Sequence, residues 1–136
     1  MRWILMMMAL ISSSSWADTI TVSDAVIREP IPGRSMSAAF MTVHNAGEQV
    51  RSLVSAKADW AGSIELHTHT HQDGVMRMRE VPAVEIPAKG QQAFASGGYH
   101  LMLMQLNLPL PAKPMIELCF ADGECLQQVF SVEAMR

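Results

Sequence analysis

Four residues that could bind one metal ion are spread along this chain. Ten residues separate His67 from Met78, twenty-one separate Met78 from His100, and one separates His100 from Met102. Two imidazoles and two thioethers suit a soft, monovalent metal, and Cu(I) fits best because thioether sulfur selects it. Magnesium or calcium would prefer oxygen ligands, and a structural zinc would usually take thiolates. The residue types therefore predict a Cu(I) site.

Strand periodicity predicts that these side chains share faces. Residues two apart on a strand point the same way, so His100 and Met102 lie on one face of their segment. By the same rule His67, His69 and His71 form a row on one face of the segment before the Gln72-Asp73-Gly74 turn. The sequence therefore places both groups of candidate ligands on regular strand faces.

The turn at Asp73-Gly74 leaves the pairing of the next strand open. A two-residue Asp-Gly loop sets His69 opposite Met78, whereas a four-residue loop sets His67 opposite Met78. Either loop places the histidine row and the methionine row on the same face. On spacing alone, His67 and His69 compete for the ligand role.

The other methionines and histidines have simpler interpretations. Met41 and Met115 are expected to fill gaps in the core. Met76 and Met104 are expected to pack around the metal ligands. His69 and His71 are interpreted as solvated residues, and the alternative is an auxiliary Cu(II) site in which His67, His69 and His71 form a fan.

The rest of the chain predicts an all-β domain. No long stretch after Asp18 shows a 3.6-residue apolar period, and short period-two runs are broken by Gly, Pro, Asn or Asp. The expected strands lie at 20–27, 37–44, 50–57, 63–70, 75–80, 84–86, 91–95, 99–106, 115–120 and 124–132. Such a pattern predicts a Greek-key sandwich or barrel of about eight short antiparallel strands.

The first seventeen residues predict a secretory signal peptide. Arg2 is followed by an apolar run, and Ser15-Trp16-Ala17 offers a small-residue cleavage site before Asp18. The run is shorter than the roughly 20 residues of a membrane-spanning helix, so a retained anchor is the less favoured alternative. We therefore expect export to the periplasm, cleavage after Ala17, and a single β-domain over residues 18–136.

The charge balance argues against two classes of partner. The formal net charge is -3, and loss of Arg2 with the predicted signal makes the domain slightly more acidic. Nucleic-acid binding usually requires a basic patch, and a membrane surface attracts polybasic segments. We expect neither nucleic-acid binding nor stable membrane association.

The two cysteines lie close together in the last predicted hairpin. A type I turn over Phe120-Ala121-Asp122-Gly123 closes a three-residue loop and sets Cys119 directly opposite Cys125. A two-residue loop would put the sulfurs on opposite faces. In an exported protein this register predicts a disulfide, and the alternative is a pair of buried free thiols.

The ligand spacing and its surroundings resemble the PCuAC family, small periplasmic Cu(I) chaperones with a cupredoxin-like β-fold. The resemblance runs from about Val26 to Val132. The segments that carry it are Glu65-Leu66-His67, Asp73-Gly74-Val75-Met76-Arg77-Met78 and Gly97-Gly98-Tyr99-His100-Leu101-Met102-Leu103. The resemblance implies the ligand set His67, Met78, His100 and Met102. It therefore favours His67 over His69 as the ligand, and with it the register that pairs His67 with Met78.

The resemblance also implies a function. The chain would carry Cu(I) and pass it by ligand exchange to the copper subunit of a cytochrome oxidase, with a Sco-type thiol protein as a co-worker. We expect no enzymatic activity, because neither a Ser-His-Asp nor an H-E-x-x-H pattern occurs. One alternative, a blue-copper electron carrier, needs a Cys thiolate, and no His follows either Cys. The other alternative is a structural sandwich without metal.

Overall fold

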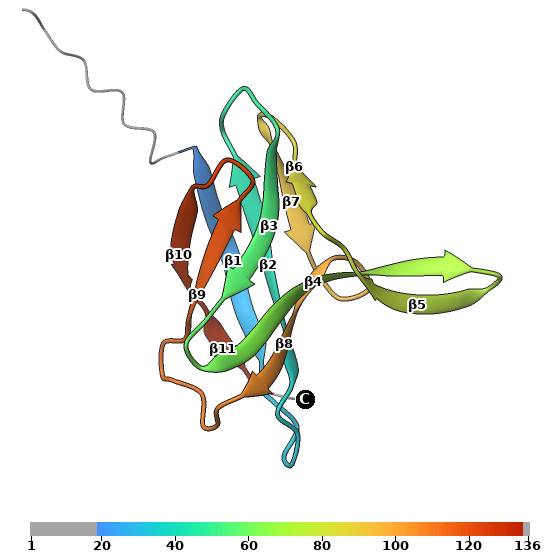
Figure 1. The fold of residues 1–136 in the computed structure, drawn as a ribbon, viewed down its shortest axis with the longest axis vertical. Helices are drawn as coiled ribbons and strands as arrows, with labels where there is room; N and C mark the ends of the chain where they lie inside the picture. Colours follow the sequence, from blue (N-terminus) through green and yellow to red (C-terminus); the bar gives the residue numbers. More distant parts are fainter. Residues whose placement is uncertain (1–18, 135–136) are drawn as a thin grey trace, which may run out of the picture.

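The described residues form an all-β domain (Figure 1). The structure is a computed structural model that describes residues 19–134, so the predicted signal peptide and its cleavage site lie outside the described residues. Its strands are β1 (Ile20–Arg28), β2 (Ser37–Asn45), β3 (Arg51–Lys57), β4 (Ala61–Gln72), β5 (Val75–Glu80), β6 (Val84–Ile86), β7 (Gly90–Phe94), β8 (His100–Leu106), β9 (Met115–Phe120), β10 (Cys125–Val129) and β11 (Ser131–Glu133). Within this part of the chain, no helix has the length and apolar character needed to cross a bilayer.

The all-β prediction is confirmed, but the expected count of about eight strands is too low. Short pairings at the sheet edges account for part of the difference, because β6 and β11 have three residues each. The predicted last strand is also divided in two. Phe130 is buried, and its N–H donates to the carbonyl of Pro114 at 2.8 Å, so the chain leaves β10 and begins β11 on another partner.

The strand order shows how the sheet encloses a core. The strands follow the path β10-β9-β3-β4-β8-β2-β1-β11, with β5 paired to β4, β6 to β3 and β7 to β2. The two ends of this path, β10 and β11, are consecutive in the chain and joined by Phe130, so the sheet must bend back on itself. This closure is typical of a β-sandwich.

Alternating apolar residues fill the interior. Leu101 and Leu103 of β8 are fully buried, and each such side chain stabilises the fold by about 1.5–3 kcal/mol. Met41 is buried in the same core, as expected. Met115 is exposed instead, because it is the first residue of β9 and directly follows the loop of residues 107–114. The inward face of β8 therefore fixes the direction of its outward face, which carries His100 and Met102.

The β9–β10 hairpin has the predicted register. Cys119 and Cys125 are directly paired and form a disulfide. The N–H of Phe120 donates to the carbonyl of Glu124 at 2.9 Å, and Gly123 has a φ of 91°, a left-handed conformation that favours glycine. The disulfide prediction is confirmed.

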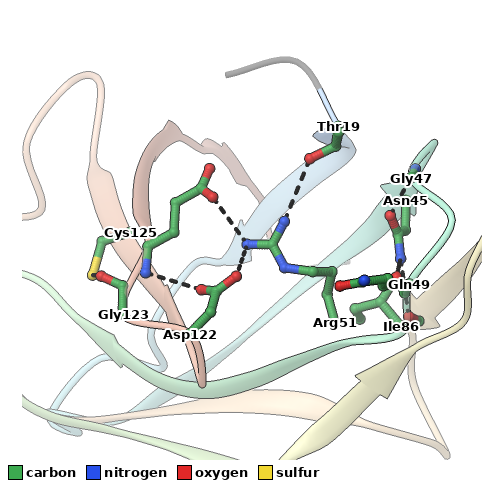
Figure 2. Close-up of polar contacts among 10 residues, drawn as sticks. Thr19, Asn45, Gly47, Gln49, Arg51, Ile86, Asp122, Gly123 and Cys125 are labelled. Atoms are coloured by element: carbon green, nitrogen blue, oxygen red, sulfur yellow. Dashed lines mark hydrogen bonds and ion pairs between the residues drawn. The ribbon is translucent and has the colours of Figure 1, made fainter. Parts of the chain in front are cut away.

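Arg51 anchors this hairpin to β3 (Figure 2). Its Nη2 lies 2.9 Å from Asp122 Oδ2 and 3.2 Å from Glu124 Oε2. Its guanidinium also lies over the ring of Phe120, 5.0 Å from the centroid. The loop that closes the β9–β10 hairpin is therefore held by charge as well as by the covalent bond.

Candidate metal centre

Strand pairing between β4 and β8 brings three of the predicted ligands together. His67 lies directly opposite His100, and Glu65 lies opposite Met102. Directly paired residues point to the same face of a sheet, about 5 Å apart at Cβ, and the next residue along a strand face is a diagonal neighbour. His67 is therefore the direct neighbour of His100 and the diagonal neighbour of Met102.

The β4–β5 pairing places Met78 on the same face but further away. His69 is opposite Met78, and His67 is opposite Glu80. The expected pairing of His67 with Met78 is wrong, because Asp73 and Gly74 form a two-residue turn with φ values of 52° and 76°. A turn with two left-handed residues matches the twist of a hairpin and favours the shorter loop.

His67 still has the better position among the competing histidines. It is a diagonal neighbour of Met78 on one side and of Met102 on the other, and it faces His100 directly. His69 faces Met78, but it lies four positions along β4 from Glu65, the partner of Met102. That offset is about 13 Å along the strand. A site that includes Met102 therefore centres on His67.

The four candidate ligands range from the core to the solvent. His100 is 3% exposed and Met102 is 9% exposed, whereas Met78 is 48% exposed. Figure 1 shows why, since β5 and the end of β4 extend away from the rest of the domain. The structure thus brings His67, His100 and Met102 together on paired strands, and it leaves Met78 exposed on the projecting hairpin.

The hydrogen bonds of His100 orient its ring. Its Nδ1 lies 3.1 Å from the carbonyl oxygen of Gly98, which leaves Nε2 available for another partner. Burial lowers the pKa of His100 below 6.5, and the nearby His69 and His67 lower it further, while the Gly98 hydrogen bond acts in the opposite direction. The ring is therefore neutral at pH 7, as metal binding requires.

His67 has unused nitrogens in a buried position. Its Nδ1 and Nε2 are both shielded from solvent and make no hydrogen bond with any described residue. Glu65 Oε2 lies 3.5 Å from Nε2, outside hydrogen-bond geometry. Because buried polar atoms are normally paired, these nitrogens are consistent with an imidazole that binds an ion.

His67, His69 and His100 form a histidine cluster that was not predicted from the sequence. The ring centroid of His100 is 5.7 Å from that of His67 and 5.3 Å from that of His69. His71 is exposed and paired with Met76, so the fan of His67, His69 and His71 is replaced by a group in which His100 takes the third place. Only the long-range pairing of β4 with β8 reveals this group.

An aromatic and a basic residue extend the same face. Phe40 of β2 lies beside His100, with ring centroids 6.4 Å apart. Arg28 of β1 lies 5.2 Å from the Phe40 centroid. Both were missed from the sequence, although the period-two pattern of residues 37–44 was a signal that Phe40 shares a face with Ala38.

The nitrogens of the three rings do not yet converge. Among the described residues, one group of His, Cys, Asp and Glu side chains has all its ligand atoms within 4.8 Å, and it consists of Glu117, Cys119 and Cys125. Both cysteines of that group are in the disulfide and cannot bind as thiolates. The imidazoles of β4 and β8 are not grouped in this way among the described residues, so a shared ion would require their side chains to rotate.

The LpqE-like family, described as "Putative lipoprotein LpqE-like", matches residues 20–132. The chain belongs to this family. A protein of Leifsonia xyli subsp. xyli, described as "Putative lipoprotein Lxx21020", is 37% identical to this LpqE-like chain over 110 residues. The matched part covers 79% of the chain and 65% of that relative, so the chain spans less than two thirds of its length.

Solved structures confirm the resemblance to PCuAC proteins. DR1885 from Deinococcus radiodurans is similar in its apo form (31% identity, TM-score 0.66, 99% of this chain and 92% of that one). Its Cu(I) form is also similar (34% identity, TM-score 0.67, 86% and 81%). The copper-bound PCuAC domain from PmoF2 shares the fold at 20% identity, with a TM-score of 0.71 over 86% and 94%. The LpqE-like chain thus has the cupredoxin-like fold of these domains.

Proposed function

We propose that this LpqE-like protein is a metallochaperone that binds Cu(I) through His67, Met78, His100 and Met102. The observation that carries the proposal is the strand register, which makes His67 the neighbour of the other three residues on one face of β5, β4 and β8. The Cu(I) form of the relative DR1885 supports the choice of metal.

The donor atoms suit Cu(I) in both kind and protonation state. Two thioethers provide neutral, polarizable sulfur, which favours Cu(I) over Cu(II). The lowered pKa of His100 removes the need to displace a proton at pH 7. His67 contributes a nitrogen that is buried and unpaired among the residues described.

The unequal exposure of the ligands suits copper transfer by ligand exchange. We propose that Cu(I) first binds the three ligands His67, His100 and Met102, and that Met78 becomes the fourth ligand when the β4–β5 hairpin bends inward. Since Met78 is the exposed ligand, it would leave first when an acceptor approaches from the β5 side. The acceptor is a copper-binding protein, and the resemblance implies the copper subunit of a cytochrome oxidase, assisted by a Sco-type thiol protein.

We also propose a periplasmic location. The family description as a lipoprotein supports export, and the predicted signal peptide would direct it. Thioether ligands do not form disulfides, so the site would persist in an oxidising compartment, whereas a bare thiol pair would be oxidised. The Cys119–Cys125 disulfide fits the same compartment.

Neither electron transfer nor catalysis is part of the proposal. A blue-copper site needs a cysteine thiolate, and both cysteines of the chain are joined in a disulfide on β9 and β10. Those strands do not pair with β8. The proposed role is therefore binding and delivery of copper.

An anaerobic Cu(I) titration against a competing chelator tests this function. The parent chain should bind one tight equivalent. Met78→Leu and Met102→Leu should each weaken binding by at least about 10-fold, because loss of a residue that only supports a ligand already costs about 10- to 100-fold. Met76→Leu is the matched control, because Met76 is exposed on the same face of the same strand. Its affinity should equal that of the parent.

Two results would overturn the proposal. Failure of the parent to bind Cu(I) would favour a metal-free structural sandwich. Equal affinity of the parent, Met78→Leu and Met102→Leu would reject the ligand assignment.

A further inference from the structure

We infer that the same face holds a second, overlapping donor set, and that His67, His69 and His100 bind Cu(II). The inference rests on the proposed function, since it shares two imidazoles with the proposed Cu(I) site. It differs in that His69 replaces the two methionines. The observations that carry it are the placement and the unpaired nitrogens of these rings.

His69 is the unexplained member of the cluster. Its Nδ1 is shielded from solvent and makes no hydrogen bond within the described part of the chain. By contrast, His44 has a partner, since its Nε2 lies 2.7 Å from Ser23 Oγ. A buried, unpaired imidazole nitrogen destabilises a fold unless something binds it. Three such atoms, two from His67 and one from His69, lie beside His100.

The separations of His67 and His69 from His100 are those of imidazoles that bind a common ion. An imidazole nitrogen binds a divalent metal at about 2.0 Å, which puts the centroids of neighbouring rings about 5 Å apart. The observed separations from His100 are 5.3 Å to His69 and 5.7 Å to His67. The nitrogens of these rings are not all within 4.8 Å of one another in the described residues, so binding would require rotation about the side-chain bonds to point them at a common centre.

The donor chemistry favours Cu(II) over Cu(I) for this set. Cu(II) prefers nitrogen and oxygen donors, and it binds such sites more tightly than other divalent first-row metals do. Glu65 offers a carboxylate oxygen beside the cluster, 3.5 Å from His67 Nε2. The thioethers are not needed, so the nitrogen set can be occupied while Met78 stays on the open hairpin.

The two donor sets predict opposite mutational patterns. With CuSO4 as the probe and a competing chelator, His69→Gln should lower Cu(II) affinity by at least about 10-fold, the smallest loss typical of residues that support a ligand, and should leave Cu(I) affinity within about twofold of the parent. Met78→Leu should lower Cu(I) affinity and leave Cu(II) affinity unchanged. His71→Gln is the matched control, because His71 is exposed on the same strand face and should affect neither metal state.

Electron paramagnetic resonance supplies an independent readout. The Cu(II) form of the parent should show hyperfine coupling to three imidazole nitrogens, and His69→Gln should lose one of them. Unchanged coupling and unchanged Cu(II) affinity in His69→Gln would overturn the inference while the Cu(I) titration still supports the proposed function. Failure of the parent chain to bind Cu(I) would instead reject the proposed function itself.

Discussion

Two hairpins of this protein share an Asp-Gly turn and use it differently. In the β9–β10 hairpin, Gly123 alone is left-handed and the loop has three residues, so Cys119 faces Cys125. In the β4–β5 hairpin, Asp73 and Gly74 are both left-handed and the loop has two residues, so His69 faces Met78. The same dipeptide therefore gives two registers, and the register decides which side chains meet.

The two hairpins also differ in how firmly they are attached. A disulfide and the ion pairs of Arg51 fix the β9–β10 hairpin to the domain. All described side chains of β5 are exposed, and this hairpin projects from the domain (Figure 1). Under the proposed function, the β9–β10 hairpin would contribute stability and the β4–β5 hairpin would take part in ligand exchange. Changes in one should leave the other's property intact.

The largest expected effect comes from removal of the disulfide. The double variant Cys119→Ala and Cys125→Ala should lower the free energy of unfolding by about 2 kcal/mol, because a short loop in the unfolded chain is released. Urea unfolding of oxidised parent and variant measures this loss. Cu(I) affinity should be unchanged, and a parallel loss of affinity would show that the two hairpins are coupled.

Matched substitutions in the two turns should separate the hairpins further. Gly123→Ala places an L-residue at a φ of 91° and should lower global stability by about 1 kcal/mol. Gly74→Ala imposes similar strain at a φ of 76°. An added Cβ meets nothing within 4 Å at either site, so the two variants differ from the parent by backbone strain and not by a steric clash.

The readouts of the two turn variants should be opposite. Because the β4–β5 hairpin projects from the domain and its β5 side chains are exposed, we expect it to open locally, and Gly74→Ala should change the urea midpoint less than Gly123→Ala does. It should weaken Cu(I) binding severalfold, whereas Gly123→Ala should leave Cu(I) binding unchanged. Equal losses of stability in both variants would contradict the separation.

Acid should affect the copper face in a defined direction. The pKa of His100 is lowered in the fold by burial, so the folded state binds fewer protons than the unfolded state just below pH 6.5. The stability of the apo protein should therefore decline as the pH falls from 6.5 toward the lowered value, and His100→Gln should show a shallower decline. Urea unfolding at a series of pH values checks this, and an identical slope in both proteins would contradict it.

Much of the fold could be predicted from local patterns, because alternation and turn residues are local. The ten predicted segments lie where strands form, and the cysteine register followed from a single turn. The split at Phe130 could not be predicted, since it depends on Pro114 and on the new partner β1. Edge pairings such as β3 with β6 are equally non-local.

The candidate site was predicted in composition but not in geometry. The ligand spacing singled out four candidate residues, and strand parity predicted the faces of the individual strands on which they lie. The pairings of β4 with β5 and β8 then place all four on one face. The register at Asp73-Gly74 had two solutions in the sequence, and the resemblance favoured the wrong one. His69 joins the cluster only because β8 pairs with β4, which brings residues more than thirty positions apart into contact.

X-ray absorption at the copper edge measures directly whether both thioethers and both imidazoles bind one ion. In the Cu(I)-loaded chain, we expect two sulfur ligands at about 2.3 Å and two nitrogen ligands at about 2.0 Å. Met78→Leu should lose one sulfur, and Met76→Leu should keep both. A coordination sphere without sulfur, or one that does not change in Met78→Leu, would contradict the convergence of β4, β5 and β8 on a single Cu(I).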